Sequence, residues 1–277
     1  MPEGHTVHRL ANRHRRMLVG RRLAVDSPQG RFAEGAALVD GQRLGGTEAW
    51  GKHLLHHYPD EGDVWLHVHL GLYGKFRDGT GEPPEPRGAL RLRLVADAEP
   101  GRSSYADPVW VELRGPTACE LMTSPERDAL LARLGPDPLR ADADVEQVAA
   151  RVAGSRMPIG TLLMDQRSVA GVGNVYRAEV LFRHGVHPRT PSRDVDPVTW
   201  KAMWDDLVVL MRAGVRAGRI VTTEPDDRSR AGRVTRADAH YVYRRQGFPC
   251  RRCGARVLAD DLAARRVFWC PVCQPEV

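Results

Sequence analysis

The chain has 277 residues, of which 42% are hydrophobic and 27% are charged. This length exceeds one typical domain, and the hydrophobic content can fill real cores, so we expect two or three domains. The formal net charge of +6 favours an anionic partner such as nucleic acid, although a solvated basic surface gives the same count. No stretch reaches the roughly 18 apolar residues of a membrane span, so we expect a cytoplasmic protein with no membrane partner.

The amino terminus carries a possible covalent catalyst. Methionine ahead of proline is normally removed, so we expect Pro2 to present a free secondary amine beside the carboxylate of Glu3. An α-amino group titrates near about 7.7–8.0, so part of it is unprotonated at neutral pH. Attack on an aldehydic carbon would give an iminium ion that acts as an electron sink, with Glu3 moving protons nearby. Many proteins begin Met-Pro without such chemistry, so this pair alone leaves both readings open.

The first 123 residues predict a β domain that follows one helix. Apolar residues recur at helical spacing from Val7 to Leu18, and the pattern ends at Gly20. Short β-type runs separated by glycine, proline and aspartate then occur at residues 22–25, 53–58, 64–70, 90–96 and 109–114. This pattern favours an antiparallel sandwich or barrel.

From Ser124 onward the pattern becomes helical. Ser124-Pro125-Glu126 is a typical helix start, and further helices are predicted at residues 145–152, 160–169, 175–184 and 197–217. The sequence therefore predicts a helical domain after the β domain.

The strongest local signal is a cysteine pattern near the end of the chain. Cys250 and Cys253 are followed, 16 residues later, by Cys270 and Cys273. This spacing is typical of a four-cysteine zinc site, and because four protein ligands leave no open position, the single zinc ion should be structural. Strands predicted at residues 256–258 and 267–269 would form the hairpin that the metal holds. A redox pair is the alternative, and Cys119 is expected to be a small buried hydrophobe.

Two glycine-containing stretches in the middle of the chain suit nucleic acid. At residues 165–179 a helix meets a glycine turn and a second helix, whose exposed amides together with Asn174 could bind a phosphate. An asparagine-capped turn is an equally good reading. At residues 67–75 a strand ends in a loop that displays Leu72 and Tyr73, which could enter a base stack or simply pack as a hairpin. The histidines at 53, 56, 57, 67 and 69 are expected to be core or surface residues rather than metal ligands.

Taken in order, these motifs resemble the formamidopyrimidine-DNA glycosylase and endonuclease VIII family. The resemblance rests on Pro2-Glu3-Gly4, Gly51-Lys52-His53, residues 69–74, residues 165–179 and the four cysteines. It implies a multidomain α+β fold: a β-sandwich with a terminal helix (1–123), a helix-two-turns-helix domain (124–235) and a zinc finger hairpin (236–277). It also implies a monomeric, nucleoid-associated protein whose partner is damaged DNA in duplex, bubble or single-stranded form.

The resemblance assigns three catalytic residues. Pro2 would attack the anomeric carbon of the damaged nucleotide, release the base and drive β,δ-elimination of both flanking phosphates. Glu3 would protonate the sugar ring or the leaving group and carry protons afterwards. Lys52, one of only three lysines in an arginine-rich chain, would contact a phosphate near the lesion.

Four further residues would bind DNA by the same resemblance. Asn174 and Arg265, the latter five residues before Cys270, would contact phosphates. Leu72 and Tyr73 would fill the gap left when the damaged base is pulled out of the stack.

Departures from the family pattern bear on specificity. Thr6 stands where many members have a second carboxylate, Gly71 stands where endonuclease VIII has glutamine, and Asp107-Pro108 leads into Val109-Trp110 rather than an arginine pair. The missing arginine pair, together with Leu72-Tyr73, favours the endonuclease VIII branch and oxidised pyrimidines as substrates. The start at residues 2–6 and the stretch at residues 50–53 resemble the actinobacterial members of that branch. The alternatives are a purine-branch glycosylase for formamidopyrimidine or 8-oxoguanine lesions, and a lesion-binding protein that does not cut.

Overall fold

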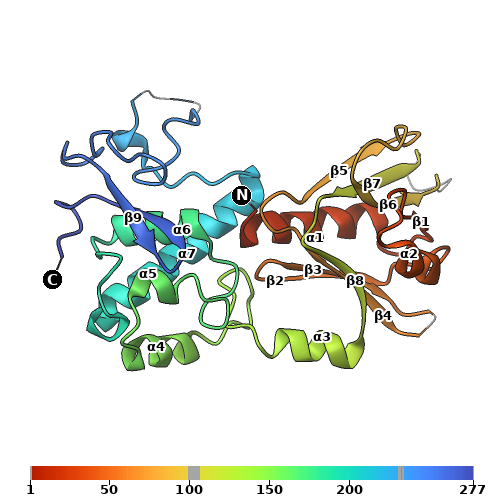
Figure 1. The fold of residues 1–277 in the computed structure, drawn as a ribbon, viewed down its shortest axis with the longest axis horizontal. Helices are drawn as coiled ribbons and strands as arrows, with labels where there is room; N and C mark the ends of the chain where they lie inside the picture. The colour runs from red at the N-terminus through yellow and green to blue at the C-terminus, as the bar shows by residue number, and fades with distance from the viewer. Residues whose placement is uncertain (1, 61, 99–106, 230–231, 233, 277) are drawn as a thin grey trace. The chain divides into compact units, whose positions relative to one another are not determined.

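The computed structural model describes residues 2–60, 62–98, 107–229, 232 and 234–276. It divides into two compact units, one containing Val7–Arg133 with Pro2 and the other Leu134–Val277 with Glu3–Thr6 (Figure 1). The division falls after Arg133, ten residues later than the predicted boundary, because helix α3 (Ser124–Leu131) packs on strands of the first unit. The finer three-domain division stays a prediction. Among the described residues, every helix is too short or too polar to traverse a lipid bilayer.

The first unit is a sandwich of two four-stranded sheets in which all neighbouring strands are antiparallel. One sheet has the order β1 (Ala24–Asp26), β6 (Leu90–Ala96), β7 (Val109–Arg114) and β5 (Lys75–Thr80). The other has the order β2 (Gly46–Trp50), β3 (His53–Tyr58), β4 (Val64–His69) and β8 (Ala118–Thr123). The predicted β-sandwich is thus confirmed.

Helix α1 (Gly4–Leu18) runs between the two sheets (Figure 1). Its apolar side contributes Val7, Ala11 and Leu18 to the sandwich core. In addition, Arg13 pairs with Asp78 of β5, and the backbone carbonyl of Ala11 accepts a hydrogen bond of 2.8 Å from the Thr47 hydroxyl of β2. The helix therefore ties both sheets to the segment that carries the amino terminus.

The second unit contains four α-helices and a hairpin in its described part. They are α4 (Val145–Gly154), α5 (Ile159–Leu162), α6 (Asn174–Arg183), α7 (Pro197–Ala217), β9 (Leu258–Leu262) and β10 (Arg265–Trp269). Helix α7 begins where predicted, with Pro197 in its first turn and Asp196 accepting from the Thr199 amide at 2.8 Å.

Two predicted elements of this unit were wrong in extent. The helix expected at 160–169 ends at Leu162, because the Asp165 side chain accepts hydrogen bonds from the Arg167 amide and the Ser168 hydroxyl and so stabilises a turn instead. The first hairpin strand begins at Leu258 rather than residue 256.

Helix α6 lies at the centre of the second unit. Its residues from Asn174 to Phe182 are all buried, although three of them can form strong polar interactions. One side packs in the helical core, and the other joins a separate core made with residues 241–243 and the cysteine hairpin. A helix that is buried all round must find partners for its polar groups inside the protein.

The sandwich contains a buried histidine pair that should make folding sensitive to acid. Nδ1 of His14 lies 3.0 Å from Nε2 of His56, and the other nitrogen of each ring has no partner among the described residues. Burial, helped by the Arg13 charge, lowers the pKa of His14 to about 3, and burial also holds the pKa of His56 well below its usual value. Below about pH 6.5 the unfolded chain binds protons that the folded rings exclude, so the free energy of unfolding should fall with pH, by at most about 1.4 kcal/mol per unit for each ring.

Urea unfolding at a series of pH values from about 7.5 to 5.0 would measure this slope, because this range spans the ordinary histidine pKa of about 6.5. The slope of the wild type is compared with that of the double variant His14→Phe/His56→Leu. Both proteins keep the other histidines, so a difference in slope reports on the buried pair. The variant should lose part of the acid sensitivity; an unchanged slope would contradict the assignment.

Candidate functional site

The Glu3 carboxylate binds the start of helix α6. It has no exposed surface, and its two oxygens accept hydrogen bonds from the backbone amides of Gly173 at 3.0 Å, Val175 at 2.8 Å and Tyr176 at 3.4 Å. The amide of Gly4 also donates to the carbonyl of Gly171 at 2.8 Å. Because a helix start carries partial positive charge, this location favours a negative carboxylate.

Gly173 is required for this contact. A Cβ atom added there would lie 2.3 Å from the Glu3 carboxyl carbon, although the backbone of Gly173 (φ −124°, ψ −165°) is open to any residue. The constraint is therefore the close approach of Glu3 and not backbone strain.

The sequence predicts that the amides of the glycine turn could bind a phosphate. In the structure the Glu3 carboxylate binds three of these amides instead. Asn174 is itself 7% exposed. Nδ2 of Asn174 donates to the carbonyl of Arg266 at 2.9 Å, and Oδ1 accepts from Arg177. The role of Asn174 in binding DNA remains a prediction.

Arg265 lies at the first position of β10, directly after a tight turn. Ala263 and Ala264 in that turn both have positive φ, at 50° and 57°, which matches the backbone of a two-residue hairpin. The Arg265 side chain is exposed, while the carbonyl of the next residue is held by α6. The structure thus brings Glu3, Asn174 and the start of β10, the strand that begins with Arg265, together around α6.

Glu179 is a structural residue of this region that the sequence reasoning passed over. Its buried carboxylate accepts hydrogen bonds from the amides of Tyr241, Val242 and Tyr243 at 2.7–2.9 Å, and also from the Thr222 hydroxyl. It therefore fixes the segment that leads into the zinc cysteines. The available signal was an acidic residue directly flanked by the apolar Ala178 and Val180 in a predicted helix.

Lys52 and the loop with Leu72 and Tyr73 lie at the same end of the sheet formed by β2, β3, β4 and β8. Lys52 lies in the turn between β2 and β3, and β3 begins with His53, which pairs with His69 at the end of β4. The loop that follows β4 exposes 48% of Leu72 and 85% of Tyr73. Burial and the nearby charges, Lys52 among them, lower the pKa values of His53 and His69.

The absence of glutamine at position 71 has a steric reason. Gly71 has φ +64°, and a Cβ atom there would lie 1.8 Å from the Thr117 hydroxyl oxygen. Any side chain at this position would have to displace Thr117. Within the loop, Leu72 and Tyr73 are the large apolar side chains with exposed surface.

The histidines of this sheet form a hydrogen-bonded row. Nδ1 of His53 lies 2.9 Å from Nε2 of His67, whose Nδ1 lies 2.9 Å from the Glu120 carboxylate. In the part of the chain that the structure describes, the one group of side chains with metal-binding geometry is the set of four cysteines.

Pro2 is half-buried and belongs to the first unit, as does Lys52, whereas Glu3, Asn174 and Arg265 belong to the second. The predicted site residues are therefore distributed over both units, with Pro2 and Glu3 joined by the peptide bond between them.

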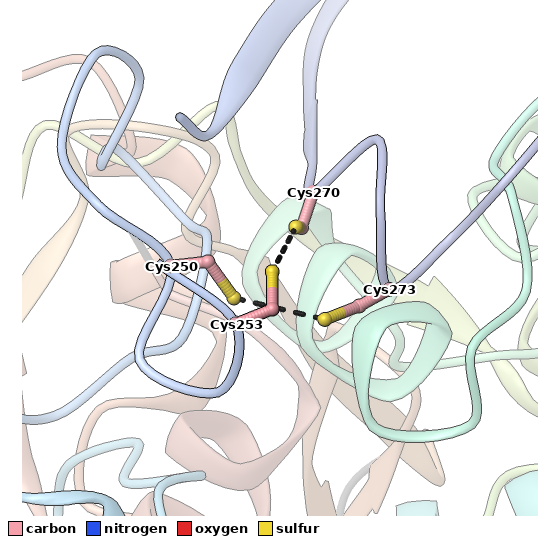
Figure 2. Close-up of side chains that lie close together, drawn as sticks. All are labelled: Cys250, Cys253, Cys270 and Cys273. Atoms are coloured by element: carbon pink, nitrogen blue, oxygen red, sulfur yellow. Dashed lines mark hydrogen bonds between the residues drawn. The ribbon is translucent and has the colours of Figure 1, made fainter. Parts of the chain in front are cut away.

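The four cysteines converge on one point (Figure 2). The Sγ atoms of Cys250 and Cys273 are 3.8 Å apart, those of Cys253 and Cys270 are 3.4 Å apart, and all four lie within 4.8 Å of one another. A zinc ion bound by four thiolates at about 2.3 Å separates the sulfurs by about 3.8 Å, so the cluster fits the ion with little adjustment. No position remains for a substrate, and the metal is structural.

Zinc removal should unfold the hairpin and loosen its packing on α6. Val257 and Phe268 of the hairpin region share a core with Phe182 of α6, and this small layer depends on the metal. We expect one zinc per chain by elemental analysis, lost in Cys270→Ser together with a red shift of tryptophan fluorescence from Trp269. Cys119→Ser is the matched control and should keep its zinc; zinc-free wild type with unchanged fluorescence and melting would contradict this account.

Comparisons with known proteins agree with this geometry. Residues 1–109 match the formamidopyrimidine-DNA glycosylase N-terminal domain, and residues 134–226 match the formamidopyrimidine-DNA glycosylase H2TH domain. Among solved structures, a complex between Lactococcus lactis Fpg and an abasic-site DNA has a TM-score of 0.77 and 22% identity, covering 99% of this chain and 100% of that chain. That likeness confirms the fold.

Relatives in sequence identify the family. The chain is 48% identical to Endonuclease 8 1 of Mycobacterium tuberculosis, over 99% of this chain and 100% of the relative. It is also 34% identical to a formamidopyrimidine-DNA glycosylase of Parasynechococcus marenigrum, over 99% of both chains. Together with the two matched domains, these identities show that the chain belongs to the formamidopyrimidine-DNA glycosylase and endonuclease VIII family of DNA glycosylases.

Proposed function

We propose that the protein is a bifunctional DNA glycosylase and abasic-site lyase that removes oxidised pyrimidines. The observation that carries the proposal is the Glu3 carboxylate, which α6 holds in one place directly beside Pro2 in the chain. A protein that only bound lesions would have no use for a buried carboxylate next to a terminal secondary amine.

In the proposed reaction the unprotonated Pro2 nitrogen attacks the anomeric carbon, and the bond from that carbon to the damaged base breaks. The sugar ring opens as its oxygen takes a proton, which leaves an iminium ion between Pro2 and the sugar. Loss of a proton from the neighbouring carbon then expels the 3′ phosphate, and a second elimination expels the 5′ phosphate. Water finally releases Pro2.

Glu3 would move the protons in this sequence. The helix start favours its charged form before substrate arrives, so the carboxylate is suited to accept a proton from the Pro2 ammonium. The resulting acid could then protonate the sugar oxygen or the leaving base. The same group would therefore serve as base first and as acid second.

Damaged DNA is the proposed partner. Lactococcus lactis Fpg, the structural relative, has been solved with abasic-site DNA and with Fapy-dG DNA. In this chain Lys52, Asn174 and Arg265 would contact phosphates, consistent with the net charge of +6. The exposed Leu72 and Tyr73 would occupy the gap left by the extruded nucleotide.

The substrate branch is tested by comparing two duplexes, one with thymine glycol and one with 8-oxoguanine. We expect the protein with a native amino terminus to release thymine glycol at least about tenfold faster and to leave phosphate at both ends of the gap. The expectation rests on the resemblance of the chain to the endonuclease VIII branch, which its 48% identity to Endonuclease 8 1 supports. Faster release of 8-oxoguanine would place the protein in the purine branch, which the 34% identical glycosylase represents. Binding without any release would favour the non-catalytic alternative.

The close contact at Gly173 gives a second test. Gly173→Ala puts a methyl group against the Glu3 carboxyl and should displace it, so base release should fall by about 10²-fold or more, the range expected for loss of a positioned acid-base group. Gly154→Ala is the matched control, since a Cβ at that helical glycine meets nothing within 4 Å. Full base release by Gly173→Ala would show that the position of Glu3 is unimportant.

Glu3→Gln separates the proton-transfer role from the lyase step. It should slow base release more than cleavage of a preformed abasic site, because only base release needs a proton delivered to a poor leaving group. Equal loss of the two activities, measured on matched duplexes, would contradict the acid role.

A further inference from the structure

Three side chains on one face of the sheet formed by β2, β3, β4 and β8 make a hydrogen-bonded row that the proposed reaction does not use. His53 begins β3, His67 lies in β4, and Glu120 lies in β8 directly opposite His67. Nδ1 of His53 is 2.9 Å from Nε2 of His67, and Nδ1 of His67 is 2.9 Å from Oε1 of Glu120. The row therefore crosses three strands, and its His53 end follows Lys52 directly in the chain.

The row connects solvent to a ring nitrogen without a protein partner. The Glu120 side chain is 55% exposed and lines a groove beside α3, whereas the His67 side chain is only 5% exposed. His53 is partly exposed, and its Nε2 makes no hydrogen bond within the part of the chain that the structure describes. That nitrogen is therefore available to a ligand.

The carboxylate fixes where the protons of the row lie. An ionised carboxylate only accepts hydrogen bonds, so Nδ1 of His67 carries a proton and donates it to Glu120. Nε2 of neutral His67 is then an acceptor, which makes Nδ1 of His53 the donor between the two rings. Neutral His53 consequently has an unprotonated Nε2.

The surrounding charges decide where an added proton is best accommodated. Burial and four nearby positive or protonatable groups lower the pKa of His53 to about 3. These groups are His67 and His69 of β4, Lys52 of the turn before β3, and Arg133, which follows α3. Burial also lowers the pKa of His67, but there the hydrogen bond and the charge of Glu120 act in the opposite direction. A positive charge is therefore more stable on His67 than on His53.

We propose that this row couples DNA binding to the uptake of a proton, so that His53 donates through Nε2 to the phosphate that Lys52 contacts. A proton from solvent binds Nε2 of His53, and the Nδ1 proton of His53 passes to Nε2 of His67. His53 stays neutral as a donor, and the new positive charge resides on His67 beside Glu120. The inference rests on the proposed function, because it takes Lys52 as a phosphate ligand.

Linkage between the proton and DNA fixes the direction of the pH dependence. A bound phosphate raises the pKa of the row above its value in the DNA-free protein, so affinity should rise as the pH falls through that higher pKa. Glu120→Gln should remove this gain, because the charge that stabilises protonated His67 is lost. Electrostatics alone predicts the opposite, since loss of a negative charge should strengthen binding to DNA at every pH.

Proton uptake is measured by titration calorimetry with a duplex that carries a tetrahydrofuran abasic analogue, in buffers of different ionisation enthalpy at about pH 6.5. The control is His57→Gln, because His57 lies on the same face of β3 and pairs with Asp63, outside the row. We expect the control to match wild type, and Glu120→Gln to take up at least about half a proton fewer. Glu120→Gln should also bind at least about fivefold more weakly at about pH 6.5, and as tightly as wild type or more tightly at about pH 8.5.

Equal proton uptake by wild type and Glu120→Gln would overturn the inference, because the proton would then bind elsewhere, for example at His69. Tighter binding by Glu120→Gln at both pH values would overturn it as well. Melting temperatures of the DNA-free proteins check that each variant is folded. If Glu120→Gln does not fold, His53→Gln decides: a smaller proton uptake supports the row, and an unchanged uptake refutes it. Failure of the wild type to bind the duplex at either pH would instead refute the proposed function.

Discussion

The contact between the Glu3 carboxylate and the start of α6 is the interaction on which the rest of the site depends. It joins the third residue of the chain to amides 170–173 positions later, at 2.8–3.4 Å. Hydrogen bonds to a charged group contribute about 1.5–3 kcal/mol each, and the helix start adds a favourable field. The contact thereby holds the start of the chain at one position, which suits the reaction proposed at Pro2.

Helix α6 supplies three further buried polar groups, Asn174, Arg177 and Glu179. Asn174 and Arg177 bind the carbonyl at the start of β10, and Glu179 binds the segment that precedes the cysteines. Each buried polar group thus fixes a different part of the chain. The zinc ion completes the arrangement, because the hairpin that carries Arg265 is too small to fold without it.

The sequence was most informative where metal binding requires a fixed spacing of the ligands, and where a strand is strongly apolar. The cysteine spacing predicted the zinc site, and β3, β6 and β7 were predicted at their observed bounds because their residues are mostly buried. Strands β2, β5 and β8 were missed, since much of each strand is polar or half-exposed and stability comes from pairing with neighbours.

Contacts between distant residues could not be read from the sequence. Nothing local shows that Glu3, rather than a phosphate, occupies the amides at Gly173 and Val175, or that Thr117 fills the space beside Gly71. The alternating histidines of β4 likewise gave no sign that His67 would bridge His53 and Glu120. In each case the partner is supplied by the fold and lies far away in the chain.

The most direct test of the central claim is borohydride trapping on abasic-site DNA, using protein with a native amino terminus, followed by mass mapping of the cross-linked peptide. The account predicts a single covalent adduct at the Pro2 nitrogen, with Glu3 unmodified beside it. An adduct at a lysine such as Lys52, or tight binding with no adduct, would contradict catalysis by the terminal proline.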